Sequence, residues 1–365
     1  MEKSKSKKGL IIIIAICMII LVVSILSFFI WYKNSLKAVS PNEKDSSVRI
    51  VIPEKTGTVG IAEILYNKGL IKNELSMKIY AKINKINNLQ AGKYDLNRSD
   101  DLPTILSHIQ NGDIANDEVK ITFIEGKNIR WFAKKIADKT NNTEEDVYNL
   151  LKDEEYIDSL IKKYWFLTDE IKDSQIYYPL EGYLLPDTYV FENEDVSVKT
   201  IFNIILNYMD KKLMSLKDVI NSKTYTVHQM LTLASMAELE GKSDTDRAKI
   251  VGVFFNRLNA NMSLGSDVTT YYAFKVDMGE RDLTKQELNT YSPYNTRGPN
   301  MEGKIPIGPI CNPSVSAIKA ALNPEAIDAL YFVADKTGKV YFSKDLDEHN
   351  ETIKQLKEQG LWYEY

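Results

Sequence analysis

A run of 24 residues without a charged side chain, from Gly9 to Tyr32, constrains this chain more than any other feature. As an α-helix that rises about 1.5 Å per residue, it would reach roughly 36 Å, more than the roughly 30 Å of a bilayer's hydrocarbon core. A cleaved signal peptide has an apolar stretch of only about 7–15 residues. No cysteine follows the run directly, so a lipid anchor has no attachment point. We therefore predict an uncleaved transmembrane helix over residues 9–32.

The residues on either side of this run predict its orientation. The short segment before it is basic, while Trp31 and Tyr32 at its far end are typical of a membrane interface. The basic residues are Lys3, Lys5, Lys7 and Lys8. Because positively charged flanks stay in the cytoplasm, we expect residues 1–8 to be a cytoplasmic tail. Residues 33–365 are then extracytoplasmic, attached to the cell membrane by a single span.

Charge and the scarcity of metal-binding side chains argue against two classes of function. The formal net charge of the whole chain is −4. Residues 1–34 have a net charge of +4, so the rest of the chain has a net charge of −8. An acidic body lacks the basic faces that bind nucleic acid. The sequence has three His and two Cys, none at the spacing of a zinc site. We therefore expect no nucleic-acid partner, no metal site and no cofactor.

Apolar periodicity divides the exported part into modules of mixed helix and strand, which predicts the α+β fold class. Val48, Ile50 and Ile52 alternate as in a strand, and helical patterns follow them. A second alternating strand at 118–124 opens a larger block. The predicted segments after the membrane helix are a polar tether 33–46, a small α+β module 47–115, an intermediate α+β region 116–225, a helix-rich region 226–350 with the candidate site, and a C-terminal tail 351–365.

The stretch 177–189 is aromatic and has no helical period. Its four tyrosines surround Glu181 and Asp187, and aromatic faces beside carboxylates suit sugar rings. A packed loop below a domain junction explains the same composition equally well. Both interpretations stay open at this point.

Glu240 is the candidate catalytic residue. It ends a largely apolar helical pattern over residues 226–240, and Gly241 follows it. Apolar surroundings raise the pKa of a carboxyl, and the negative end of the helix dipole disfavours its charged form. A Glu that stays protonated near neutral pH can act as a general acid. A solvated surface charge is the ordinary alternative for a Glu at a helix end.

Glu238 is the rival of Glu240. Two residues on a helix are about 200° apart, so the two carboxyls face nearly opposite ways and only one can enter a given cleft. The residues alone leave open which of the two is the acid.

Seven short motifs occur in one order along the chain. They are LEGYLLPDTY at 180–189, LASMAELE at 233–240, VFFNRL at 253–258, MSLGSDVT at 262–269, SPYNT at 292–296, GPICNP at 308–313 and LYFVAD at 330–335. Together they resemble the MltG (YceG-like) family of endolytic murein transglycosylases, and the resemblance covers nearly all of residues 9–350. It implies a LysM-like module at 47–115 and a YceG-like domain after it, with a lysozyme-like glutamate at a helix end.

The resemblance also implies a reaction. Such an enzyme, a lyase that acts on a polysaccharide, cuts the MurNAc–GlcNAc β-1,4 bond within a peptidoglycan strand and leaves a 1,6-anhydro-MurNAc end. One Glu is enough: it donates its proton to the leaving O4 and then removes the proton from the MurNAc O6, which closes on C1. No second carboxylate is needed, unlike in most glycoside hydrolases. We assign this role to Glu240.

The same motifs supply candidates for substrate contact, namely Asn256, Arg257, Asp267, Tyr294 and Asn295. Asn256 and Arg257 either orient the sugar or support Glu240 from the following helix. Asp267 either contacts the substrate or a neighbouring side chain, or caps a loop. Tyr294 and Asn295 are expected to stack on and hydrogen-bond the N-acetyl sugars.

The length of the tether predicts how far from the membrane the enzyme can act. Its 14 residues extend no more than roughly 50 Å, so the enzyme should act near the membrane, where strands are made. We therefore expect it to cut nascent strands beside a peptidoglycan synthase and so to end their elongation.

Two other functions stay open. One is a hydrolase of the same glycan that uses Glu240 with Asp267, and the other is a non-catalytic wall-binding scaffold of the synthesis machinery. The mass of the product separates the two enzymes, because the lytic product weighs one water less. A Glu240→Gln variant separates an enzyme from a scaffold.

Overall fold

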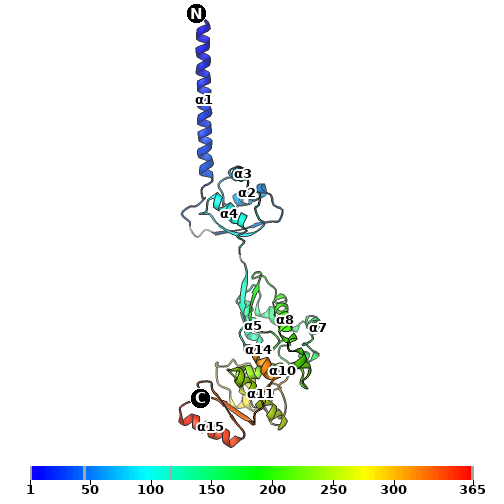
Figure 1. Cartoon of the computed structure of the whole chain (residues 1–365). Coiled ribbons are helices and arrows are strands. Elements are labelled where there is room, and N and C mark those ends of the chain that lie inside the picture. The colour runs from blue at the N-terminus through cyan, green and yellow to red at the C-terminus, as the bar shows by residue number, and fades with distance from the viewer. Residues whose placement is uncertain (1, 44–46, 116, 363–365) are drawn as a thin grey trace. The chain divides into compact units, whose positions relative to one another are not determined.

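The structure, a computed structural model, describes residues 2–43, 47–115 and 117–362, without the side chains of residues 2–9. The chain divides into two compact units, Met1–Asn116 and Asp117–Tyr365 (Figure 1). The predicted boundary between residues 225 and 226 separates no compact units, because both of its sides belong to the second one.

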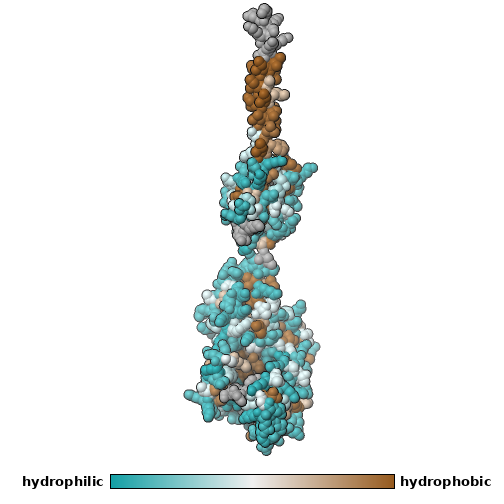
Figure 2. Space-filling view, turned by 90° about the vertical axis from the view of Figure 1, so that its left-hand side faces the viewer, coloured by the Kyte–Doolittle hydropathy of each residue, from teal (hydrophilic) through white to brown (hydrophobic). Residues whose placement is uncertain are grey.

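Helix α1 is continuous from Glu2 to Ser35. Its segment Leu10–Ser35 has a mean hydropathy of 3.4, and its apolar side chains are exposed as the column of hydrophobic surface in Figure 2. Among the described residues it is the one helix long and apolar enough to cross a membrane. The predicted span of 9–32 therefore lies within α1.

The segment predicted as a tether is not free over its described part. Residues 33–35 belong to α1, after which Leu36 packs against the core of the small module and Ala38 is buried. The backbone N–H of Leu102 donates to the carbonyl of Leu36 at 2.9 Å. Residues 44–46 of the predicted tether lie outside the described residues. The predicted reach of 14 extended residues is therefore wrong, because most of the segment is helical or held against the module.

The small module is built from β1 (Ser47–Ile52), α2 (Thr58–Asn67), α3 (Glu74–Ile83), β2 (Gly92–Asn97) and α4 (Leu102–Asn111). The two strands are antiparallel, with Ile50 opposite Tyr94, and the buried sides of both strands share one core with the helices. Helix α4 begins after its cap, Asp101, whose side chain accepts the N–H of Thr104 at 3.0 Å. Thr58 is the first residue of α2, and Gly57 holds the cap position before it.

The larger unit begins with β3 (Val119–Thr122), which pairs antiparallel with β4 (Thr188–Phe191). The helices between and after these strands are α5 (Ile129–Ala137), α6 (Glu144–Lys152), α7 (Glu154–Lys163), the 3₁₀ helix η1 (Asp169–Lys172), α8 (Val198–Met214) and α9 (Lys217–Asn221). One hydrophobic core runs from this part into the helices that follow, which explains why residues 117–365 form one unit.

The second half of this unit contains α10 (Val227–Glu240), α11 (Asp244–Asn259), α12 (Asp267–Ala273), α13 (Lys285–Leu288) and α14 (Val315–Leu322). Helix α10 packs against α11, α12 and α14. A hairpin of β5 (Tyr331–Ala334) and β6 (Val340–Ser343) follows, and α15 (Leu346–Glu358) packs on it. Residues 351–358, predicted as part of a tail, are thus helical, and Leu356 is buried.

Candidate active site

Glu240 is the last residue of α10, a helix that is buried over most of its length. Thr226 begins the helix with a capping box, in which its hydroxyl and the side chain of Gln229 each accept the other's backbone N–H. Every residue from Met230 to Ala237 is buried. The helix ends at Glu240, and a side chain at Gly241 would come 3.0 Å from the Cγ of Arg247. The sequence therefore fixes both ends of the helix, as its capping signals predict.

The surroundings of Glu240 favour its protonated form. Glu240 is half-buried, and the hydroxyl of Ser266 donates to its Oε1 at 2.6 Å. Burial raises the pKa of Glu240 to about 7, and the negative charge of Asp267 adds to the rise. The Ser266 hydrogen bond and the charge of Arg297 act in the opposite direction. At neutral pH this carboxyl can therefore both give and take a proton.

Glu238 has different surroundings. Its side chain is 5% exposed, and its Oε1 accepts from the Nη2 of Arg247 at 2.7 Å. Its Oε2 accepts from both the backbone N–H and the hydroxyl of Ser314, at the start of α14. In all these contacts the carboxyl group of Glu238 is the acceptor, and together they hold α10, α11 and α14 in place. Glu238 is placed as a structural residue, on another side of α10 from the one that meets Ser266.

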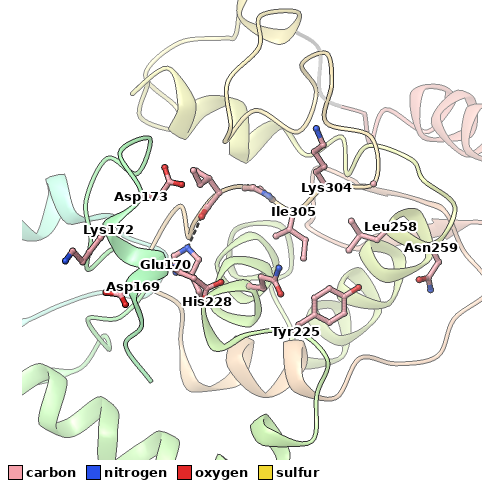
Figure 3. A pocket seen from close by; sticks show the side chains of 14 residues that line it. Asp169, Glu170, Lys172, Asp173, Tyr225, His228, Leu258, Asn259, Lys304 and Ile305 are labelled. Atoms are coloured by element: carbon pink, nitrogen blue, oxygen red, sulfur yellow. Dashed lines mark hydrogen bonds between the residues drawn. The ribbon is translucent and has the colours of Figure 1, made fainter. Parts of the chain in front are cut away.

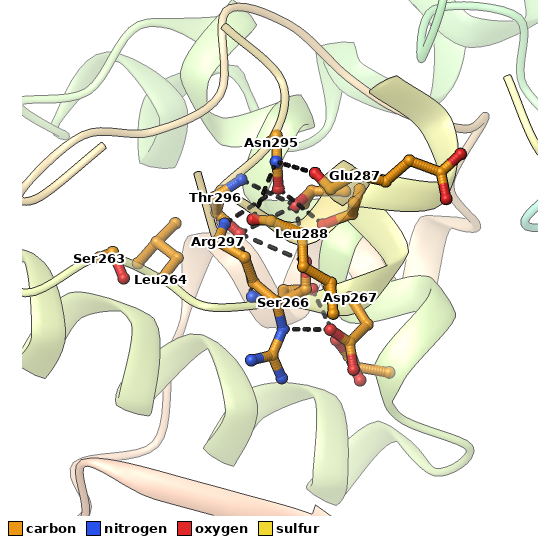
Figure 4. Close-up of polar contacts among 12 residues, drawn as sticks. Ser263, Leu264, Ser266, Asp267, Glu287, Leu288, Asn295, Thr296 and Arg297 are labelled. Atoms are coloured by element: carbon orange, nitrogen blue, oxygen red, sulfur yellow. Dashed lines mark hydrogen bonds and ion pairs between the residues drawn. The ribbon is translucent and has the colours of Figure 1, made fainter. Parts of the chain in front are cut away.

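The loop that carries Ser266 is fixed by a network of hydroxyl groups (Figure 4). The backbone N–H of Ser266 donates to the hydroxyl of Thr296 at 2.9 Å, and its carbonyl accepts from the hydroxyl of Thr269 at 2.6 Å. Next to it, Asp267 and Arg297 form an ion pair in which both side chains are about half exposed. Asp267 is the first residue of α12 and lies beside Glu240. Its carboxylate is paired with Arg297 and is therefore not free.

Tyr294 and Asn295 do not reach a sugar in this structure. Both are fully buried. The ring of Tyr294 packs against those of Tyr177 and Tyr272, with centroids 4.8 and 4.9 Å away. The amide of Asn295 accepts from the hydroxyl of Thr270 at 2.6 Å and donates to backbone carbonyls of 287–290. The expectation that these two residues contact the substrate is wrong here, because their polar groups and ring faces are used inside the core.

Asn256 and Arg257 support the site from α11. The amide of Asn256 donates to two carbonyls of the segment 327–329, at 2.7 and 2.9 Å. The guanidinium of Arg257 donates to the carbonyls of Ser263 and Leu264, at 3.1 and 3.2 Å, just before Ser266. Of the two roles expected for these residues, the contacts therefore fit support of Glu240 better than contact with the sugar.

Glu181 is a residue whose role the sequence did not reveal. It is 2% exposed, and it accepts from the backbone N–H of Ile129, the hydroxyl of Tyr272 and the amide of Asn312. Burial raises its pKa to about 8, while the N–H of Ile129 and the hydroxyl of Tyr272 oppose the rise. Tyr183, in the same stretch, is also buried. Around Glu181 the stretch 177–189 is a packed loop rather than a wall for sugars.

A cavity at the start of α10 does not contain the candidate acid. It has a volume of about 760 Å³ and lies beside His228 and Gln229, at the start of α10 (Figure 3). The twelve helical steps from His228 to Glu240 span about 18 Å. A second cavity of about 470 Å³ is lined by Leu239 and Val268, which are next to Glu240 and Asp267 in the chain. Glu240 itself is not among its lining residues, but of the two cavities this groove lies nearer to it.

Among the residues that the structure describes, no three His, Cys, Asp or Glu side chains gather as a metal site. What the described site offers is a protonated carboxyl with a raised pKa, at the end of a rigid helix and beside a groove. Such an arrangement is typical of the active sites of enzymes that use general-acid catalysis.

Comparison with known proteins identifies the family. Residues 50–355 match the model of the YceG-like family, and the chain therefore belongs to that family. It is 37% identical over 325 residues to the endolytic murein transglycosylase of Bacillus subtilis, and covers 88% of each chain. It is 34% identical over 338 residues to the enzyme of the same name from Streptococcus pneumoniae, of which it spans 60%.

A solved structure agrees with this relationship. The crystal structure of a YceG-like protein from Listeria monocytogenes is 35% identical in sequence and superposes with a TM-score of 0.60. The match covers 84% of this chain and 99% of the other one. The shared fold therefore includes most of the described elements.

Proposed function

We propose that this protein is a membrane-anchored endolytic peptidoglycan transglycosylase with Glu240 as its single catalytic carboxyl. Three observations support this: membership of the YceG-like family, relatives named endolytic murein transglycosylases, and the surroundings of Glu240. The observation that carries the assignment is the contrast between the two candidates. The carboxyl of Glu238 is held by Arg247 and Ser314 in contacts between helices, whereas burial raises the pKa of Glu240.

The proposed reaction uses Glu240 twice. Protonated Glu240 gives its proton to the O4 of the leaving GlcNAc while the bond to C1 of MurNAc breaks. The resulting carboxylate removes the proton from the MurNAc O6, whose lone pair forms the new bond to C1. The product is a 1,6-anhydro-MurNAc end, and Glu240 is protonated again. A pKa near the working pH suits a group that must act first as an acid and then as a base.

The N-terminal half is proposed to place this reaction. Helix α1 is long and apolar enough to cross a membrane, and basic residues precede its apolar part. We propose that residues 1–8 are cytoplasmic and that the rest lies outside, where glycan strands and their synthases are found. The strand–helix–helix–strand order of residues 47–97 supports a LysM-like, glycan-binding role for the small module. Residues 36–43 that contact this module would keep it close to the membrane surface.

Mass spectrometry of the products tests the reaction. The full-length protein, purified in detergent, is incubated with peptidoglycan strands, with the Glu240→Gln variant as the matched control. The proposal expects fragments with anhydro ends, each one water lighter than a hydrolysis product, from the unaltered protein alone. Reducing ends would indicate a hydrolase, and no cleavage would indicate a scaffold.

An exchange of the anchor tests the proposed place of action. In cells, α1 is replaced by a cleavable signal at matched protein level, and the lengths of the glycan strands are measured. Released protein is expected to lose its effect on nascent strands, so that the strands become longer. An unchanged length distribution would contradict a role for the anchor.

A further inference from the structure

The groove beside Glu240 has aromatic and basic walls that the reaction itself does not use. It is lined by the following residues: Gly126, Lys127, Asn128, Arg130, Trp131 and Lys134 around the start of α5, Glu144 and Tyr148 of α6, Leu239 of α10, Val268, Tyr271 and Tyr272 of α12, and Val276, Asp277, Met278 and Ile310. Its volume of about 470 Å³ is in the usual range of ligand sites. A groove of this size is larger than the transfer of one proton requires.

The charges that line the groove leave a positive surplus. Arg130 is used within the protein, because it donates to the carbonyl of Lys275 at 2.7 Å and pairs with Asp277 at 2.8 Å. Lys127 and Lys134 are exposed, and within the described part of the chain neither ammonium group has a carboxylate within 4 Å. The remaining lining carboxylate, Glu144, accepts a long hydrogen bond from Tyr148 at 3.4 Å. Two unpaired cations therefore oppose one anion, which favours an acidic ligand.

The aromatic side chains give the groove a second property. Trp131, Tyr148 and Tyr271 line it from three different helices. Faces of this kind pack against the apolar sides of pyranose rings, as ring faces do against other flat apolar groups. Sugar and negative charge occur together in a murein strand, where MurNAc carries a short peptide with free carboxylates.

We propose that this groove binds the peptide-bearing sugar unit next to the cleaved bond, with its carboxylates paired to Lys127 and Lys134. The inference rests on the proposed function and adds to it the part of the substrate that the enzyme selects. A strand whose peptide carboxylates are ionised is thereby preferred over a strand in which they have been made neutral. The two lysines are binding residues that act on affinity and not on the chemical step.

The walls of the groove are fixed before any ligand arrives. Glu181 accepts the N–H of Ile129 at the start of α5 and the hydroxyl of Tyr272 in α12, with lengths of 3.1 and 3.0 Å. Asn312 adds a contact from its amide to the carbonyl of Lys127 at 3.1 Å. Because these bonds join two opposite walls, little ordering is needed on binding, which favours affinity.

The test compares two substrates with the full-length protein in detergent. One is a preparation of short murein strands with their peptides, and the other is the same preparation after carbodiimide coupling to methylamine has turned its carboxyl groups into neutral amides. KM and kcat are measured for the unaltered protein, for a double variant Lys127→Glu and Lys134→Glu, and for Tyr271→Ala. Lys139→Glu is the matched control, because Lys139 is equally exposed but does not line the groove.

The double variant should raise KM for the peptide-bearing strands by roughly tenfold, since attraction becomes repulsion, and should leave kcat nearly unchanged. For the strands with neutralised carboxyl groups its KM should change little, and added salt should reduce the difference. Tyr271→Ala should raise KM for both substrates, and the control should behave like the unaltered protein. An equal effect of the double variant on both substrates, or none on either, overturns the proposal. If the unaltered protein cleaves neither substrate, the proposed function itself fails.

Discussion

Ser266 donates its hydroxyl hydrogen to Oε1 of Glu240, at a distance of 2.6 Å. An oxygen that accepts a hydrogen bond is the poorer place for the acidic proton, so protonated Glu240 carries its proton on Oε2. The backbone of Ser266 is itself held by Thr296 and Thr269, which leaves the donor little freedom to turn away. The serine thus decides which of the two carboxyl oxygens serves as the acid.

Substitution of the two neighbouring glutamates should separate catalysis from stability. Glu240→Gln keeps the shape of the side chain and removes its titration, so kcat should fall by roughly 100- to 10,000-fold while the unfolding midpoint stays within error. Glu238→Gln breaks the buried pair with Arg247 and should cost about 3 kcal/mol of unfolding free energy. Its folded fraction should retain most of the activity. Cleavage assays and urea unfolding of both variants check this, and the reverse pattern would make Glu238 the acid.

The value of kcat/KM should fall as the pH rises through about 7, where Glu240 gives up its proton. Ser266→Ala removes a hydrogen bond that favours the ionised form, so it should move this limb to higher pH. Asp267→Asn removes a negative charge that disfavours ionisation and should move the limb to lower pH. Profiles of all three proteins are compared at one ionic strength. Shifts of the same sign in both variants would mean that another group sets the limb.

Stability should depend on pH through Glu181. Its pKa is raised by burial from the ordinary 4.5 to about 8, so the folded state binds this proton more tightly than the unfolded state. The stabilisation is complete below pH 4.5 and is lost as the pH rises through 8, so the urea midpoint should fall between pH 5 and pH 8. Glu181→Gln should flatten this dependence, whereas Glu240→Gln should leave the Glu181 contribution in place. An unchanged slope in Glu181→Gln would show that other groups cause it.

Asn295→Ala should damage the fold rather than binding alone. The substitution leaves the buried hydroxyl of Thr270 and the part-buried carbonyls of Glu287 and Thr290 without their partner. A loss of about 2–4 kcal/mol is expected. The check is thermal unfolding, with the exposed Asn149→Ala as a control that should change nothing. A stable variant with a raised KM would restore the original expectation that Asn295 contacts the sugar.

Local signals in the sequence were enough to predict α10 and the surroundings of its last residue. Thr226 and Gly241 bound the helix because capping and chain reversal depend on neighbouring residues. The apolar side chains before Glu240 predicted its raised pKa for the same reason. Tyr294 and Asn295 were misjudged, since a polar motif in a loop looks the same whether its partners are solvent or distant backbone. Glu181 was missed because its partner Asn312 lies 131 residues away in the chain.

The burial of α10 from Met230 to Ala237 has a consequence for how such enzymes diverge. A substitution inside this stretch disturbs the core before it alters chemistry, whereas the surrounding loops and the α5 wall can change without moving the acid. Lineages of this fold should therefore differ in substrate preference mainly through residues such as Lys127 and Lys134. A library restricted to those walls is the economical starting point for redirecting the enzyme toward other acidic glycans.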